Sequence, residues 1–502
     1  MRGVSVPTAV SFNLAAAALE SMHEHGFNPE FSAEVNQQLA ALTNSPLPLS
    51  QPKDVQDLRG LLWSSIDNDT SKDLDQIEWA ESLPDGRIRI RVGVADVDGT
   101  VAKGTAIDAH AARETTSVYT GVRTFPMLPT ALSEDVTSLN ENEDRAAIVT
   151  EFCVDQQGVA SDGCIYRALV RNRAQLAYPA VGAWLEGKSA APAKVAASSE
   201  LEKQLRLQDE AARRMVGNRY QHGALDLETI ETRPVTAPGG TSGQGNSGVP
   251  TDLVRQQKNR ATSLIEEFMV AANGVMARTL EKAGVASIRR VVRMPKRWDR
   301  IVEIARGLGV NLPEQPDSKA LNEFLLEQRK NDPDHFPDLS LTVIKLMGPG
   351  EYMMVKPGEE APGHFGLAVQ DYTHSTAPNR RFPDVVTQRL LKALKSGASQ
   401  PYSAGELAEI AARCTLMEDG ARHVERDMQK RIAAVVLHPR IGQNFAGIIT
   451  GVNQHGTFVR SLDPNVDGMV VRGGKGLDVG DRVTVKLVGT NPAAGFIDFA
   501  VA

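Results

Sequence analysis

Residues 66–77 read IDNDTSKDLDQI and place four aspartates within nine positions, directly after the apolar residues 61–63. At an effective dielectric constant of ~20, two carboxylates about 4 Å apart repel each other by roughly 4 kcal/mol. A folded site that gathers three of them therefore needs a divalent cation or raised carboxyl pKa values. Because the ligands would be hard oxygens, the pattern favours Mg²⁺ or Mn²⁺.

A string rich in Asp, Asn, Ser and Thr is more often a solvated turn. The spacing here favours another structure, because Asp73 and Asp75 alternate with Leu74 and apolar residues follow at Ile77 and Trp79. This pattern predicts a loop that runs into a buried strand and holds the acidic side chains rigidly. It is not an EF-hand, since the Gly and the terminal Glu of such a calcium loop are missing.

The length and composition indicate a multidomain globular protein. A chain of 502 residues predicts three or four domains, and 41% hydrophobic with 23% charged residues is ordinary for a globular protein. The sequence has no apolar run of about 18 residues, so it predicts no membrane span. The N-terminus is expected to be a helix and not a signal peptide. Three cysteines without metal-ligand spacing favour a reduced, cytoplasmic protein.

The net charge of −7 argues against polyanion binding by the whole surface. Any nucleic acid is therefore expected to enter a local basic channel. One candidate is the run from Arg289 to Arg300, which holds six cations and a single acid, Asp299. Alone it is weak, because charge runs are most often solvated faces.

The order of patterns along the chain predicts an α+β protein. Helices are expected over residues 11–43, 199–218, 254–283 and 406–436, short strands with loops and helices over 58–175, a linker over 46–52 and a Gly/Ser-rich loop over 237–250. From residue 445 to 488, short apolar runs are separated by glycines. That succession predicts a small antiparallel β-barrel at the C-terminal end.

With these motifs in order, the chain resembles the RNase II / RNase R family of exoribonucleases over about residues 54–502. The resemblance implies a helical N-terminal region (1–50), an RNB catalytic domain (54–436) and an S-one-type OB fold (438–502). Asp67, Asp73 and Asp75 fall on three of the four acidic positions of the family's metal-binding cluster, and the fourth is Gln76. A Gln can offer a carbonyl oxygen to a metal but brings no charge.

A second motif, residues 125–140, is similar to the family's PMLP…LS…SL segment. Just before it, Tyr119 matches an aromatic residue that stacks on a base near the RNA 3′ end. The opposite stacking aromatic of the family falls near Leu227, so one wall of this clamp is expected to be aliphatic. Glu266 matches a glutamate that reads the terminal ribose, where it would accept a hydrogen bond from a 2′-OH.

The third motif, residues 372–384, resembles the family's YTHFTSPIRRY signature. Arg380 takes the place of the arginine that contacts the scissile phosphate, for which a planar, permanently charged guanidinium is well suited. Arg381 is included among the RNA-contacting residues, with a structural role as the alternative, and Asn379 replaces an apolar residue. In the barrel, Phe458 and Lys486 are expected to grip the RNA strand upstream.

The resemblance implies processive 3′-to-5′ hydrolysis of single-stranded RNA to nucleoside 5′-monophosphates, with Mg²⁺ as cofactor and Mn²⁺ as a possible substitute. The expected catalytic residues are Asp75 and Arg380. The expected metal site consists of Asp67, Asp73, Asp75 and Gln76. The protein is expected to be a cytoplasmic monomer without membrane contact. Two alternatives stay open: a catalytically degenerate RNB-fold protein that binds RNA, favoured by Gln76 and Leu227, and an unrelated metal-dependent phosphoesterase, which would not explain the barrel.

One expected departure concerns residues 1–50. Members of the family commonly carry N-terminal cold-shock barrels that help to form the RNA entrance, whereas the pattern here predicts helices. The entrance is therefore expected to be built differently, with less selectivity toward structured RNA.

Overall fold

The computed structural model describes residues 12–44, 55–161, 163–228, 231–236, 250–256 and 258–502. Its centre is a six-stranded sheet of order β1-β8-β2-β3-β4-β7. The strands are β1 (Val55–Asp57), β2 (Trp63–Asp67), β3 (Gln76–Ser82), β4 (Ile88–Ala95), β7 (Asp144–Val154) and β8 (Cys164–Ala177). Because β8 also pairs with β7, the pairings run in a closed circle through β2, β3, β4, β7 and β8.

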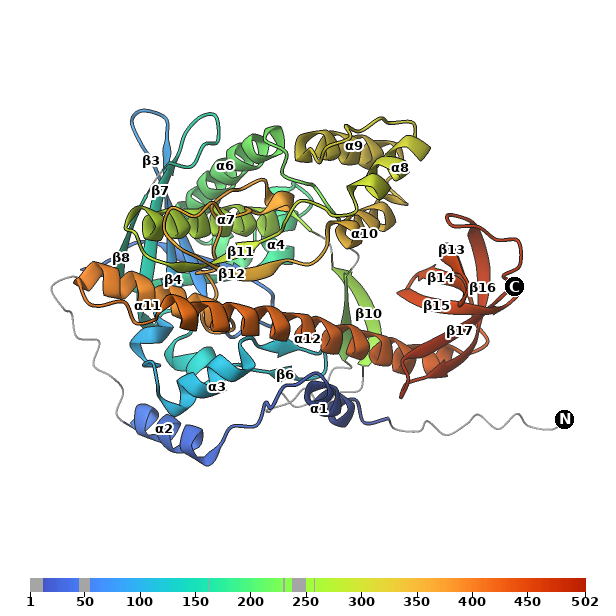
Figure 1. Ribbon diagram of the computed structural model, residues 1–502, viewed down its shortest axis with the longest axis horizontal. Coiled ribbons are helices and arrows are strands. Elements are labelled where there is room, and N and C mark those ends of the chain that lie inside the picture. Colours follow the sequence, from blue (N-terminus) through green and yellow to red (C-terminus); the bar gives the residue numbers. More distant parts are fainter. Residues whose placement is uncertain (1–11, 45–54, 162, 229–230, 237–249, 257) are drawn as a thin grey trace.

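Helices cover this sheet and share its core (Figure 1). They are α4 (Tyr178–Leu185), α5 (Ala193–Ala196), α6 (Ser199–Gln221) and α7 (Arg260–Lys282). Trp63 and Phe152 of the sheet pack in one apolar cluster with Phe268 of α7, each at most 1% exposed. Burial of such aromatic side chains is a principal source of stability for the domain.

A smaller group of helices stands beside this core and has its own apolar cluster. It consists of α8 (Trp298–Gly307), α9 (Ser318–Asn331) and α10 (Phe336–Met347), and Trp298, Phe324 and Phe336 are at its centre. A two-stranded sheet of β11 (Ser287–Val291) and β12 (Glu351–Val355) leads into and out of it. Two further short pairs are β5 (Val118–Tyr119) with β6 (Thr124–Phe125), and β9 (Glu231–Thr236) with β10 (Pro250–Gln256).

One helix of 34 residues, α12 (Ala404–Leu437), runs along the molecule and ends at the C-terminal barrel (Figure 1). Its start is fixed by a capping box, in which Ser403 and Glu406 bond to each other's backbone N–H. The closed barrel has the order β13-β14-β15-β17-β16. Its strands are β13 (Asn444–Asn453), β14 (Gly456–Leu462), β15 (Asn465–Arg472), β16 (Arg482–Asn491) and β17 (Phe496–Val501), and η4 (His438–Arg440) joins it to α12.

The N-terminal helices α1 (Leu14–Glu24) and α2 (Ala33–Asn44) pack on α12 and on α3 (Ala106–Glu114), respectively. Met22 of α1 and Met428 of α12 belong to one apolar cluster that continues into the barrel. The N-terminal helices are therefore part of the packed structure, and the predicted α+β fold with a C-terminal barrel and a helical N-terminal region is confirmed.

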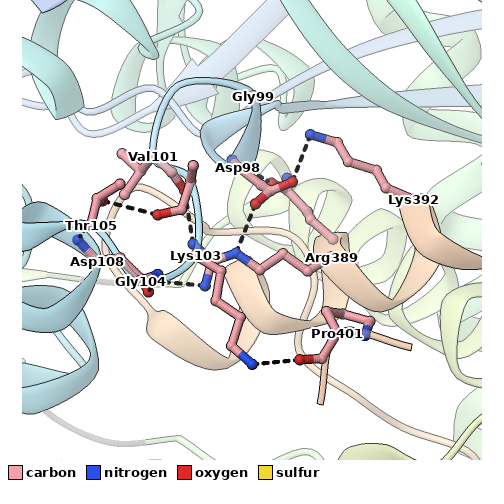
Figure 2. Close-up of polar contacts among 12 residues, drawn as sticks. Asp98, Gly99, Val101, Lys103, Gly104, Thr105, Asp108, Arg389, Lys392 and Pro401 are labelled. Carbon is pink, nitrogen blue, oxygen red and sulfur yellow. Dashed lines mark hydrogen bonds and ion pairs between the residues drawn. The ribbon is translucent and has the colours of Figure 1, made fainter. Parts of the chain in front are cut away.

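A polar network fixes helix α11 (Phe382–Ser396) against the loop that follows β4 (Figure 2). The guanidinium of Arg389, only 4% exposed, donates to Asp98 and Asp108, both at 2.7 Å, and to the carbonyl oxygen of Val101 at 2.8 Å. Lys392 donates to Asp98 at 3.0 Å. Because α11 begins directly after Arg380 and Arg381, the network also helps to hold these two arginines in place. The remaining short elements are η1 (Val97–Gly99), η2 (Ala131–Val136) and η3 (Phe365–Leu367).

The structure differs from the sequence expectations in two places. The helix expected from residue 254 begins at Arg260, after strand β10, because the Asn259 side chain caps the backbone N–H groups of the first turn. The barrel has a fifth strand, β17, which the pattern did not indicate. The expected linker over 46–52 and the loop over 237–249 lie outside the described residues.

The basic run from Arg289 does not form an open channel at its first two positions. Arg289 and Arg290 are 2% and 7% exposed and are paired with Glu281 and Glu418. Their charges are therefore neutralised inside the protein, and the prediction of a basic channel is wrong at these two positions.

Cys153, Cys164 and Cys414 are free thiols. Among the residues described, no helix is long and apolar enough to cross a membrane.

Candidate active site

The acidic loop lies between β2 and β3 and is pinned by its one apolar residue. Asp67 is the last residue of β2, and Gln76 is the first of β3. Leu74, 1% exposed, donates its N–H to Ser138 Oγ at 3.0 Å and accepts from the N–H of Leu139 at 2.9 Å. The loop therefore runs into a buried strand, as its alternation indicates, and its acids are held by a rigid backbone.

Asp75 is the most deeply placed of the loop's aspartates, with 2% exposure. Its Oδ1 accepts from the backbone N–H of Asn379 at 2.8 Å, and its Oδ2 lies 3.3 Å from Nε of Arg380 without forming a hydrogen bond. Burial raises the pKa of Asp75 to about 8, although Arg380 acts in the opposite direction. A buried carboxylate with one unsatisfied oxygen is costly, and a cation would relieve that cost.

The other two aspartates of the expected metal site, Asp67 and Asp73, accept hydrogen bonds from protein donors. Asp67 accepts from the N–H of Asn68 at 2.7 Å and from the hydroxyl of Ser71 at 2.9 Å, and burial raises its pKa. Asp73 accepts from the hydroxyl of Tyr119 at 2.6 Å. The aromatic residue expected to stack on RNA is therefore tied directly to the acidic loop.

The residues present fit a divalent cation by the chemistry of their donors. In the part of the chain that the structure describes, no three His, Cys, Asp or Glu side chains converge into a preformed cage. Oδ2 of Asp75 is nevertheless a buried carboxylate oxygen that accepts no hydrogen bond. Negatively charged oxygen ligands of this kind are those that Mg²⁺ and Mn²⁺ prefer.

The third motif brings two arginines to this site with different surroundings. The side chain of Arg380 is 43% exposed and faces Asp75, so its fork is available to a ligand. Arg381 donates to the wholly buried Asp384 at 2.7 Å. This contact favours the structural alternative for Arg381, because its charge is used to hold α11.

Two residues of this motif, Tyr372 and His374, belong to a group of aromatic rings that also includes Tyr352, which sequence reasoning did not single out. The hydroxyl of Tyr352 lies 2.7 Å from Nδ1 of His374, and Tyr372 packs edge-on against both His374 and His364. Burial, with Arg381 next in effect, lowers the pKa of His374 well below its usual value, and burial lowers that of His364 to about 4. Burial therefore disfavours the charged form of both rings.

A second group that sequence reasoning missed is Glu78 in β3, which is completely buried. Neither of its carboxylate oxygens has a hydrogen-bond partner. Burial, and then the charge of Asp67, raises the pKa of Glu78 well above its usual value. The signal in the sequence was an acidic residue between Ile77 and Trp79 in a strand expected to be buried.

Two further candidates, Glu266 and Leu227, contact other parts of the protein. Glu266 is 37% exposed and pairs with Lys258 at 2.7 Å and Arg219 at 3.3 Å. Leu227 packs against the apolar cluster of α8–α10. Tyr119 contacts Asp73 of the acidic loop instead, so the two-walled clamp stays a prediction.

In the barrel, strand β13 pairs with β14 on one side and with β16 on the other. Phe458 of β14 is opposite Gly451 of β13, and Lys486 of β16 is opposite Asn444 of β13. Gly451 and Asn444 are seven residues apart along that strand, which corresponds to about 23 Å. The two side chains thus lie toward opposite ends of the barrel and do not form one contact point. Arg460 and Arg482 pair with Asp338 and Asp334 beside α10, which fixes the barrel against the helical group.

Comparison with known proteins gives two family matches. Residues 55–397 match the model of the RNB domain, and residues 443–502 match that of the RNase II-type exonuclease C-terminal S1 domain. Ribonuclease R of Aquifex aeolicus is 29% identical over 480 residues, which cover 90% of this chain and 66% of that protein. Ribonuclease R of Escherichia coli K12 is 29% identical over 512 residues, covering 93% and 60%. The chain therefore spans less than two thirds of the length of these relatives.

Solved structures share the fold. Mycoplasma genitalium RNase R in complex with ribose-methylated single-stranded RNA aligns with a TM-score of 0.83 at 23% identity, covering 97% of this chain and 78% of that one. Yeast Ssd1, described as a pseudonuclease, aligns with a TM-score of 0.71 at 15% identity, covering 94% and 57%. A protein named RNase R and a protein described as a pseudonuclease thus share this fold, so activity has to be argued from the site.

Proposed function

We propose that this chain, which belongs to the RNase II / RNase R (RNB) family, hydrolyses single-stranded RNA processively from its 3′ end and releases nucleoside 5′-monophosphates. The observation that carries the proposal is the position of buried Asp75 beside half-exposed Arg380. Oδ2 of Asp75 accepts no hydrogen bond and faces the exposed guanidinium, so a cation and a phosphate could bind to these two groups. RNA binding alone would not need an unsatisfied buried carboxylate, which is costly to keep.

Asp67, Asp73, Asp75 and Gln76 would hold the divalent cation, Mg²⁺ or Mn²⁺. When bound, the cation would lower the pKa of the attacking water and neutralise charge on the phosphate. Arg380 would bind the scissile phosphate and stabilise the additional negative charge of the transition state. The backbone N–H of Asn379 keeps Asp75 oriented during this step.

Tyr119 would set the register of cleavage. Tyr119 is 41% exposed, and its hydroxyl donates a hydrogen bond to Asp73. The ring therefore has a fixed position from which it could stack on a terminal base. Glu266 would accept from the 2′-OH of the terminal ribose and so help to distinguish RNA from DNA. We also propose RNA contacts for Leu227, Phe458 and Lys486. That the protein is monomeric and cytoplasmic stays a prediction.

The test is a time course with a 5′-labelled, single-stranded oligoribonucleotide and Mg²⁺, with released nucleotides identified by chromatography. We expect 5′-monophosphates and a short limit product without intermediate lengths, as processive cleavage from the 3′ end requires. Tight binding of the RNA by a folded protein that leaves it intact would contradict the proposal and support the RNA-binding alternative. A ladder that shortens from the other end, or internal cuts, would contradict the polarity.

A further inference from the structure

A carboxylate that belongs to no described motif lies beside the acidic loop. Glu78 is 0% exposed, and both of its side-chain oxygens lack a hydrogen-bond partner. Buried acidic groups are normally paired or coordinate a metal, because a lone buried charge is strongly unfavourable. Glu78 therefore requires an explanation that packing alone does not give.

The strand geometry directs Glu78 to the same side of the sheet as Gln76. Both residues belong to β3, and side chains two positions apart on a strand point to the same face. Gln76 is the position where this chain lacks the fourth acidic residue of the cluster, and Glu78 has a side chain one methylene longer than Asp. An acid is thus absent at position 76 and present two residues farther along the same face of the strand.

Electrostatic effects link the Glu78 carboxylate to Asp67, and a buried hydroxyl lies opposite Glu78 on the neighbouring strand. After burial, the charge of Asp67 raises the pKa of Glu78, and after burial the charges of both carboxylates raise the pKa of Tyr178, the first residue of α4. Ser64 is directly opposite Glu78 on β2, and its buried hydroxyl also lacks a partner. A water molecule or a cation commonly satisfies such a group of buried polar atoms.

We infer that Glu78 is a further ligand of the divalent metal site, where it acts beside Asp67 and supplies the carboxylate that Gln76 does not. This inference rests on the proposed metal-dependent cleavage. A second negative charge next to Asp67 restores the charge that attracts a hard cation, and Gln76 is left as a neutral oxygen donor. The replacement of an acid at position 76 then no longer argues for a degenerate site.

The test measures Mn²⁺ binding to the full chain without RNA, by the loss of the free-ion signal in electron paramagnetic resonance. We expect Glu78→Gln, which keeps the shape of the side chain, to weaken Mn²⁺ binding by about tenfold or more. Adding Gln76→Asp to that variant should recover most of the loss. Glu81→Gln is the matched control, because Glu81 lies in the same strand with its side chain 43% exposed and paired with Arg89, and should leave Mn²⁺ binding unchanged.

Unchanged Mn²⁺ affinity in a folded Glu78→Gln variant would overturn the inference and leave the proposed function intact, whereas a wild-type chain that binds no Mn²⁺ would overturn both. If Glu78→Gln does not fold, crystals of the wild-type protein soaked in Mn²⁺ provide the second measurement. An anomalous peak within about 2.5 Å of a Glu78 oxygen would support the inference. A peak held by Asp67 and Asp75 with only a water molecule at Glu78 would overturn it.

Discussion

The acidic loop and the C-terminal barrel are both proposed to contact RNA, but they are built in opposite ways. At the loop, residues far apart in sequence meet around buried groups: Asp75 contacts Asn379 and Arg380, and Asp73 contacts Tyr119. In the barrel, Phe458 and Lys486 lie on separate strands with about 23 Å between their partners on β13. The loop is suited to fix one phosphate for chemistry, whereas the barrel is suited to hold a strand at several weak points.

This contrast is tested most strongly at Asp75. Asp75→Asn keeps the size of the side chain but removes the charge that a cation requires, so we expect cleavage to fall at least about 10³-fold while RNA affinity changes little. Single-turnover cleavage and a gel-shift titration measure the two effects separately. Asp69→Asn is the matched control, because Asp69 is in the same loop but half-exposed and paired with Arg233, and it should keep nearly full activity. Retained cleavage by Asp75→Asn would contradict the proposed metal site.

Arg380 should have the next largest effect. Arg380→Lys keeps the positive charge but loses the planar fork, so we expect kcat to fall by roughly 10²-fold, as for the loss of one transition-state donor, with a smaller change in KM. Steady-state kinetics on a short oligoribonucleotide measures both. Arg389→Lys provides the contrast: its guanidinium binds only protein groups, so it should lower the melting temperature more than kcat. Equal kinetic losses in the two variants would mean that Arg380 acts only through the fold.

Tyr119 separates stacking from hydrogen bonding at the edge of the loop. We expect Tyr119→Ala to weaken RNA binding by roughly 1–3 kcal/mol, or about 5- to 150-fold, because the stacking surface is lost. Tyr119→Phe keeps the ring and loses only the bond to Asp73, so its affinity should stay within about threefold of wild type. Fluorescence anisotropy with a labelled RNA gives both values. If the Phe variant were as weak as the Ala variant, the hydroxyl and not the ring would be the important contact.

The sequence predicted the fold better than it predicted the site. The strand after Asp75, the long helix α12 and the barrel were predictable because hydrophobic periodicity and glycine spacing are local signals. The contact of Asp75 with Asn379 was not, because 304 positions separate the two residues and backbone donors leave no sequence pattern. The burial of Arg290 was missed for the same reason, since its partner Glu418 is 128 positions away. The partner of Arg289, Glu281, is only eight positions away but lies in α7, and a run of cations does not show which of them a neighbouring helix covers.

The smallest effects are expected in the barrel, and they test whether its contacts are as dispersed as the structure indicates. Lys486 is exposed, so Lys486→Ala should weaken binding of a long RNA by only a few fold and lower the salt dependence of binding by about one counterion. Binding of an RNA too short to reach the barrel should not change. Because Phe458 and Lys486 lie toward opposite ends of β13, their Ala substitutions should be additive in free energy when combined. A loss in the double variant well beyond the sum would mean that the two side chains act on one nucleotide, and the contrast between a concentrated site and a dispersed grip would fail.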